Sequence, residues 1–275
     1  MSNAKADLLI HVNLWSLTNT GWPVADQIKA IEDVGFEGFT CHFRKDPNLK
    51  ELVADSSLRY GGFFDAATRN DDYREKIEKS LEIDNGPINV QLGDHDTLPQ
   101  EAARSSVELL QLAEDTGAEV YVEVHRDTAT ETPEKSYAIA DAYQAMTGKP
   151  IRMNFDYSHP AIVKHLGPGN YTERLIEREE LFQMSRLWHM RPFNGHHCQI
   201  PITDGKGNFS PEYEELRPFL RDAFEIWKAG PFGHTQFWVT PELGPKGGYG
   251  LSCFPDIWED TIVLGNDLKT LWAES

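Results

Sequence analysis

The sequence predicts an α/β fold, a single (β/α)8 TIM barrel that spans residues 1–275. Strand-like and helix-like segments alternate along the chain, eight of each, and no shift in composition marks a linker. The average repeat is 275/8, about 34 residues, which is the usual size of one strand, one helix and their loops in a barrel. A doubly wound open sheet would be expected to carry a glycine-rich first turn for phosphate, and this chain has none.

The first four repeats combine short apolar or alternating runs with segments of helical periodicity. Gly35 closes the first expected helix, Asn85-Gly86-Pro87 ends the third, and Pro99 suits the first turn of the fourth. We expect strands at 8–13, 36–43, 58–64 and 88–92, and helices at 22–35, 48–57, 68–84 and 101–116.

The last four repeats follow the same order, and Pro160 is expected to stop the sixth strand. Two loops, 194–210 and 243–255, are longer than a barrel requires and follow the seventh and eighth strands. They lie on the face where barrel active sites form, so we expect lids there, with plain surface insertions as the alternative. We expect strands at 118–124, 151–155, 185–191 and 237–242, and helices at 132–147, 172–184, 210–229 and 256–272.

Composition limits the classes of function. The net charge is 26 − 44 = −18, which argues against a nucleic-acid partner because such partners are bound by clustered Lys and Arg. No apolar run approaches the roughly 18 residues of a membrane span, and residues 1–7 are polar, so we expect a cytoplasmic protein without a membrane partner. Three scattered cysteines provide no disulfide framework and are expected to be reduced: Cys41, Cys198 and Cys253.

Residues of the kind that bind metals follow the strands at a regular interval. Asp156 ends the sixth strand, Glu123 lies 156 − 123 = 33 residues before it, and His189 lies 189 − 156 = 33 residues after it. Glu242 ends the eighth strand. Because side chains at the carboxyl ends of barrel strands converge on one axial site, we expect these four to meet. Three carboxylates and one imidazole suit Mn²⁺, Mg²⁺ or Co²⁺ better than a soft thiolate site does.

Four short fragments resemble those of the xylose isomerase-like TIM-barrel superfamily. Within it, the match is to the sugar phosphate isomerase/epimerase group that includes ketose 3-epimerases. The resemblance runs through essentially the whole chain, and the order and spacing of the motifs are its specific features. The fragments are Tyr121-Val122-Glu123-Val124-His125-Arg126, Asp156-Tyr157-Ser158-His159, His189-Met190-Arg191 and Thr240-Pro241-Glu242-Leu243-Gly244-Pro245.

The resemblance implies that Glu123, Asp156, His189 and Glu242 hold one divalent ion, Mn²⁺ by preference, with Mg²⁺, Co²⁺ or Zn²⁺ as alternatives. It also implies that Glu123 and Glu242 form an acid/base pair on opposite faces of a small-molecule carbohydrate, reacting through a metal-stabilised enediolate. Relatives are often dimers or tetramers, so a homodimer or homotetramer is expected.

Further residues could line a sugar site, each with a plainer alternative. By the resemblance, His159 would bind a substrate oxygen, although it could simply cap the next helix. Arg191 could hold a substrate oxygen, carboxylate or phosphate, or form an ordinary salt bridge. His125 shares the inward face of Glu123 if the adjacent valines pack outward, whereas His11 and Trp15 could either stack on a sugar or pack in the core.

Adjacent His196 and His197 form a rival zinc-like feature, but neighbours on a strand point apart and cannot easily bind one ion. In this loop the chain departs from the commoner Gly-Pro-Gln-type segment of the group, which leaves the choice of substrate open.

Several functions remain for such a barrel. A metal-dependent sugar isomerase or epimerase leads, and a lyase or dehydratase acting on a keto-sugar or inosose is the alternative, because both begin by removing a proton next to a carbonyl. An apurinic-site endonuclease shares the barrel but needs more metal ligands and a basic surface. A sugar-binding barrel without turnover is the fourth class.

Overall fold

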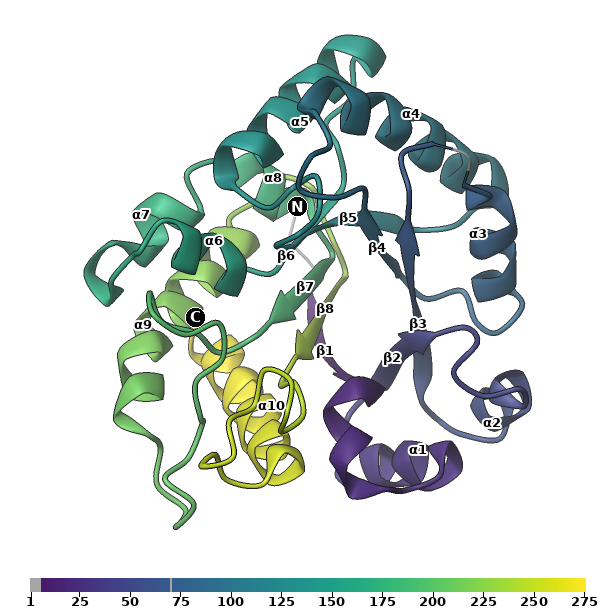
Figure 1. Ribbon diagram of the computed structural model, residues 1–275. Coiled ribbons are helices and arrows are strands. Elements are labelled where there is room, and N and C mark those ends of the chain that lie inside the picture. Colours follow the sequence, from purple (N-terminus) through teal and green to yellow (C-terminus); the bar gives the residue numbers. More distant parts are fainter. Residues whose placement is uncertain (1–5, 70) are drawn as a thin grey trace.

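Eight parallel strands form a nearly closed barrel, as the sequence predicts (Figure 1). The structure is a computed structural model, and it describes residues 6–69 and 71–275, so most of the polar segment 1–7 lies outside the described residues. The strands are β1 (Asp7–Asn13), β2 (Gly38–His42), β3 (Arg59–Ala66), β4 (Ile88–Leu92), β5 (Val120–Val124), β6 (Met153–Phe155), β7 (Leu187–Met190) and β8 (Gln236–Pro241).

The ladder of strands runs β6-β5-β4-β3-β2-β1-β8-β7. Pairing of β1 with β8 joins the two ends of the chain, and β6 and β7 lie at the two ends of the ladder. At this seam the His189 backbone N–H donates a 2.9 Å hydrogen bond to Oδ1 of Asn154. A side chain therefore links the two strands at the seam, where the strand ladder of the described residues has no backbone pairing.

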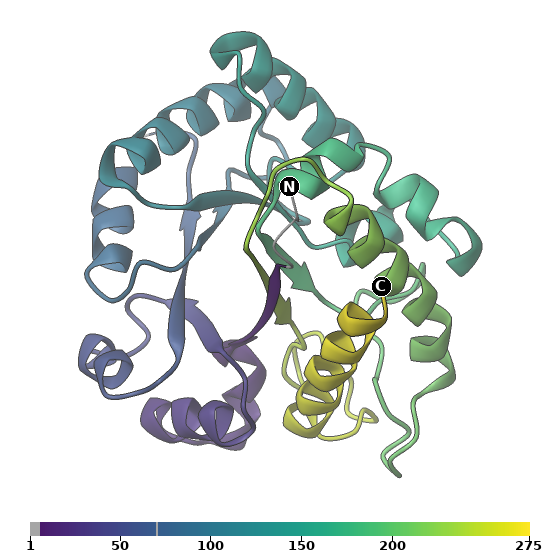
Figure 2. The same cartoon turned by 180° about the vertical axis from the view of Figure 1, so that it is seen from behind.

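Helices surround the barrel, as both views show (Figures 1 and 2). Pro133 and Pro211 occupy first helical positions, where their missing N–H needs no partner, and Thr132 and Ser210 accept backbone hydrogen bonds as N-caps. The helices are η1 (Leu14–Thr20), α1 (Val24–Asp33), α2 (Leu49–Ala54), α3 (Tyr73–Leu81), α4 (Pro99–Thr116), α5 (Pro133–Thr147), α6 (Ser158–Val163), η2 (Pro168–Asn170), α7 (Tyr171–Leu175), α8 (Glu179–Met184), α9 (Pro211–Lys228) and α10 (Ile257–Glu274).

The prediction of one helix over 172–184 is wrong. The structure has α7 and α8 there, separated at 176–178, preceded by the unpredicted short helix α6. Arg178 leaves the helical path and pairs with Asp141 of α5 at 3.1 Å, a tertiary contact that sequence periodicity does not contain. Pro160 does not simply stop the strand, because it lies in the first turn of α6, where proline is tolerated.

Side chains that point into the barrel lie in layers. Tyr121, Leu187 and Trp238 form a small buried cluster within it. Successive side chains on a strand alternate between faces, so Glu123 and His189, two residues after Tyr121 and Leu187, also point inward. Glu242, four residues after Trp238, does the same at the carboxyl ends of the strands.

Of the helices that the structure describes, none combines the length and the apolar composition that a membrane span needs.

Candidate metal centre and active site

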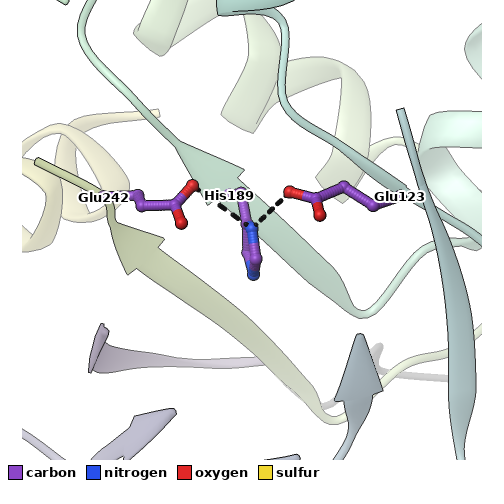
Figure 3. Close-up of side chains that lie close together, drawn as sticks. All are labelled: Glu123, His189 and Glu242. Atoms are coloured by element: carbon purple, nitrogen blue, oxygen red, sulfur yellow. Dashed lines mark hydrogen bonds and ion pairs between the residues drawn. The ribbon is translucent and has the colours of Figure 1, made fainter. Parts of the chain in front are cut away.

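Three of the four predicted ligands come together at the carboxyl ends of the strands. Glu123 stands two residues beyond Tyr121 on β5, His189 two beyond Leu187 on β7, and Glu242 directly follows β8. Nδ1 of His189 lies 2.8 Å from Oε1 of Glu123 and 3.4 Å from Oε2 of Glu242. Figure 3 shows the imidazole between the two carboxylates.

These three side chains are buried, at 1%, 2% and 6% exposure for Glu123, His189 and Glu242. Burial alone would disfavour every charge in the cluster. Mutual attraction outweighs it, so the two carboxylates raise the pKa of His189 to about 10 against desolvation. In the same way, His189 overcomes desolvation and holds the pKa of Glu123 at about 2. The pKa of Glu242 is also lowered, with Arg191 and His189 overcoming desolvation.

The donor set fits a divalent cation. One carboxylate oxygen of Glu123, one of Glu242 and one nitrogen of His189 lie within 4.8 Å of one another. Ligands bound at about 2.1 Å in octahedral geometry lie roughly 3 Å apart, close to the two distances at Nδ1. Nε2 of His189 is buried without a hydrogen-bond partner among the described residues, so Nδ1 is the nitrogen that both carboxylates face.

Asp156, the fourth predicted ligand, lies outside this group. Its Oδ2 contacts Nε of Arg191 at 3.2 Å and Nε2 of His159 at 3.3 Å. Arg191 also contacts Oε2 of Glu242 through Nη2 at 2.9 Å, so the guanidinium bridges the two carboxylates. The arginine thus supplies positive charge beside Asp156, where the sequence predicts a divalent cation. Whether Asp156 is a ligand stays a prediction.

Three amides hold the two glutamates in place and a fourth supports one of these amides; none of the four is among the predicted site residues. Asn89 and Gln91 of β4 donate to Oε2 of Glu123 at 2.7 and 2.8 Å, and Asn13 donates to Oε1 of Glu242 at 2.9 Å. Asn154 in turn donates to Oδ1 of Asn89 at 2.9 Å. The available signal was the presence of amides at inward-facing positions of otherwise apolar strands, because such groups are buried only when they have partners.

Aromatic rings enclose Arg191. Its guanidinium carbon lies 4.1 Å from the ring centre of Tyr249 and 5.5 Å from that of Trp15. Tyr249 belongs to the long loop after β8, and Arg126 contacts the same ring at 4.5 Å. Gly244 permits this approach, because a Cβ there would lie 2.5 Å from the Trp15 ring. The loop therefore packs on Arg191 together with Trp15, and its role as a lid stays a prediction.

Two predicted histidines lie close to the cluster. The ring of His159 is fixed on both sides, by Asp156 and by Sγ of Cys198, 3.4 Å from Nδ1. The ring centre of His125 lies 4.0 Å from that of His159.

His11 lies deeper in the barrel interior, beneath Asn13, and its ring centre is 3.8 Å from that of Trp238 with the two ring planes tilted by 39°. Gly38 makes room for it, because a Cβ there would lie 2.2 Å from its Cε1. The structure does not bring His11 to the cluster. His196 and His197 are exposed and have ring centres 6.3 Å apart.

A cavity of about 790 Å³ opens beside the cluster at the ends of β3, β4 and β5. Gln91 and His125 line it, and these residues contact Glu123 and the His159 ring respectively. The three clustered side chains do not themselves line the cavity, so the cavity adjoins the cluster without including it.

Comparison with known proteins gives likeness of fold. No family model and no curated protein matches the sequence. Among solved structures, a D-tagatose 3-epimerase-like protein aligns with a TM-score of 0.61 and 15% identity over 97% of this chain and 98% of its own. A probable 3-DHS dehydratase involved in petrobactin synthesis, from Bacillus anthracis, aligns with a TM-score of 0.58 and 15% identity over 96% and 98%.

A xylose isomerase-like TIM-barrel protein from Mycobacterium smegmatis, solved in complex with magnesium, aligns with a TM-score of 0.57 and 14% identity over 96% of this chain and 97% of its own. The neighbours thus match the superfamily that the sequence motifs resemble. Along nearly its whole length, the chain shares the fold of the xylose isomerase-like TIM barrels.

Proposed function

We propose that the protein is a divalent-metal-dependent sugar isomerase or epimerase. The observation that carries the proposal is the buried Glu123–His189–Glu242 cluster at the mouth of the barrel, with an adjoining cavity. Two structural neighbours support it, one described as D-tagatose 3-epimerase-like and one as a xylose isomerase-like barrel in complex with magnesium. Mn²⁺ is the proposed ion, and Mg²⁺, Co²⁺ and Zn²⁺ suit the same donors.

Glu123, His189 and Glu242 would hold the cation, which when bound would polarise a substrate carbonyl and stabilise the negative charge that develops beside it. Asp156 is proposed as a further ligand once Arg191 releases it. The two glutamates approach the imidazole from different strands, β5 and the end of β8, so a sugar held between them would expose opposite faces to the two carboxylates.

In this scheme one glutamate removes the proton next to the carbonyl and the other returns it. Buried carboxylates in fixed positions increase the rate of such transfers by about 10² to 10⁴. The amides on the second oxygen of each glutamate fix which oxygen faces the substrate. His159, His125, Arg191 and Trp15 are proposed to bind substrate oxygens or cover the sugar, because they surround the cluster.

A lyase or dehydratase is the second candidate, because one structural neighbour is described as a probable dehydratase and the same carboxylates could begin that reaction. For either reaction, we propose a cytoplasmic protein that acts on a small carbohydrate, as a homodimer or homotetramer.

Proton NMR in D₂O tests the proposal directly. The Mn²⁺-loaded protein is incubated with a panel of ketoses, with Glu123→Gln as the inactive control. Deuterium incorporation next to the carbonyl with a changed configuration or carbonyl position supports isomerisation. An unsaturated or cleaved product supports the lyase instead, and no exchange with any member of the panel would refute both.

A further inference from the structure

The cavity beside the Glu123–His189–Glu242 cluster carries an excess of carboxylates. Two cationic side chains, Arg69 and Arg126, line it. Before any histidine is counted, the formal charge of the lining is 2 − 5 = −3. The five acidic residues are Asp65, Asp94, Asp96, Glu101 and Asp127.

The positive charges are only partly available to a ligand. Nε of Arg69 lies 2.8 Å from Oε1 of Glu101, so this pair is neutral as a unit. Arg126 lies over the Tyr249 ring at 4.5 Å and makes no side-chain hydrogen bond with the described residues. Arg126 is therefore the one lining arginine that could meet an anion.

Three of the five carboxylates have a basic partner, because Glu101 pairs with Arg69 and His95 lies 2.7 Å from Asp127 and 3.7 Å from Asp96. Asp65 and Asp94 form no ion pair with the described residues. The carboxylate of Asp65, at the end of β3, forms no hydrogen bond or ion pair with any residue that the structure describes. Asp94 accepts hydrogen bonds from the hydroxyl of Thr97 at 2.8 Å and the N–H of Asp96 at 3.1 Å, and these bonds lower its pKa. Both carboxylates are acceptors placed for hydroxyl groups, and both would repel a phosphate.

We propose that this site takes an uncharged, polyhydroxylated sugar or sugar derivative and discriminates against sugar phosphates and sugar acids. The inference rests on the proposed function, because it places the reacting carbonyl at the Glu123–His189–Glu242 cluster. The remaining hydroxyls of the sugar then extend past Gln91 and donate to Asp65 and Asp94.

Binding of a matched pair tests this inference without relying on turnover. The Mn²⁺-loaded protein is titrated with D-fructose and with D-fructose 6-phosphate by ligand-observed NMR in 50 and 500 mM NaCl. We expect the neutral sugar to bind at least about tenfold more tightly than the phosphate at low salt. The affinity ratio of the two sugars should decrease at high salt, where like-charge repulsion is screened.

Two variants make the result specific. Asp65→Asn should narrow the ratio about threefold by removing one carboxylate from the cavity. Asp55→Asn makes the same charge change at an exposed position just past the end of α2, outside the cavity lining, and should leave the ratio unchanged.

Equal or tighter binding of the phosphate, lost in Arg126→Gln, would overturn the proposed substrate class. In that case, deuterium incorporation next to the carbonyl of D-fructose 6-phosphate would still support the isomerase assignment. Failure of the proposed substrate class is therefore distinguishable from failure of the proposed function. If neither compound binds, the inference is refuted, and the exchange experiment decides the proposed function by itself.

Discussion

Replacing Arg191 with methionine tests how the buried carboxylates are balanced when no cation is bound. Arg191 is 2% exposed, and its guanidinium lies 3.2 Å from Asp156 and 2.9 Å from Glu242. With His189 protonated, the cluster of Glu123, Asp156, Glu242, His189 and Arg191 carries −3 + 2 = −1. Arg191→Met changes this to −2 inside the barrel.

The expected loss is large because both partners of the arginine are buried. Opposite charges about 4 Å apart attract by ~4 kcal/mol at an effective dielectric constant of 20. Removing one member of a buried pair typically costs about 3–5 kcal/mol, since the remaining charge is left uncompensated. We therefore expect Arg191→Met to lower the free energy of unfolding by about 3–5 kcal/mol in EDTA.

A divalent cation should restore part of that stability. Mn²⁺ at 100 times its dissociation constant would add about 2.7 kcal/mol if it binds only the folded state, and more if the variant binds it more tightly. Urea unfolding in EDTA and in Mn²⁺ measures both quantities. Arg217→Met is the matched control. Arg217 pairs with Asp267 at a distance of 2.9 Å, and this pair lies away from the cluster, so Mn²⁺ should stabilise Arg217→Met no more than it stabilises the unaltered protein. A loss below about 1 kcal/mol for Arg191→Met, or a loss unaffected by Mn²⁺, would refute this reasoning.

Two other substitutions test the fold, one beside the site and one at the amino ends of β3 and β4. Asn154→Ala should lower the free energy of unfolding by about 2–4 kcal/mol and reduce turnover, because it leaves the backbone N–H of His189 and the side-chain oxygen of Asn89 buried without their partner. Denaturant unfolding and the exchange assay measure the two effects. A loss of stability under 0.5 kcal/mol (about the error of such a measurement) would contradict the role of this hydrogen-bond network. Asp84→Asn should cost about 1 kcal/mol at pH 7, because Asp84 is part-exposed and accepts hydrogen bonds from Nε of Arg59 at 2.9 Å and from the Tyr60 N–H at 3.0 Å. Desolvation raises the pKa of Asp84, but these donors lower it more. The stability that Asp84 contributes is therefore present above its unfolded pKa of about 4 and is lost as pH falls through the lower pKa of the folded state. The unfolding midpoints of the two proteins, measured from pH 7 down to pH 3, should converge as the pH falls, and a difference independent of pH would contradict this role of Asp84.

The sequence contained enough to predict the barrel and most of its elements, because strand and helix periodicities and the glycine or proline stops are local properties. The break between α7 and α8 was not predictable in this way, since the periodicity continues across residues 176–178, where Arg178 instead contacts Asp141 of α5. Likewise, the spacing of 33 residues brought Glu123 and His189 to one end of the barrel, but spacing fixes only the phase of a residue along its strand.

Which side chains touch within that layer depends on neighbours that the spacing does not specify. Arg191, two residues past His189, points into the same interior and takes Asp156 as a partner. The amides Asn89 and Asn154 were passed over because a single inward amide resembles a satisfied core residue in sequence. Tyr249 comes from a loop whose path no periodicity predicts, although the length of the loop indicated either a lid or a surface insertion.

Metal binding by the purified protein tests the central claim most directly. Equilibrium dialysis of the EDTA-treated protein against Mn²⁺, followed by elemental analysis, should give one ion per chain, with the affinity reduced at least about tenfold in Glu242→Gln and unchanged in the surface control Glu274→Gln. Failure to bind Mn²⁺, Mg²⁺, Co²⁺ or Zn²⁺, or binding that Glu242→Gln leaves intact, would contradict the assignment of the Glu123–His189–Glu242 cluster as a metal centre.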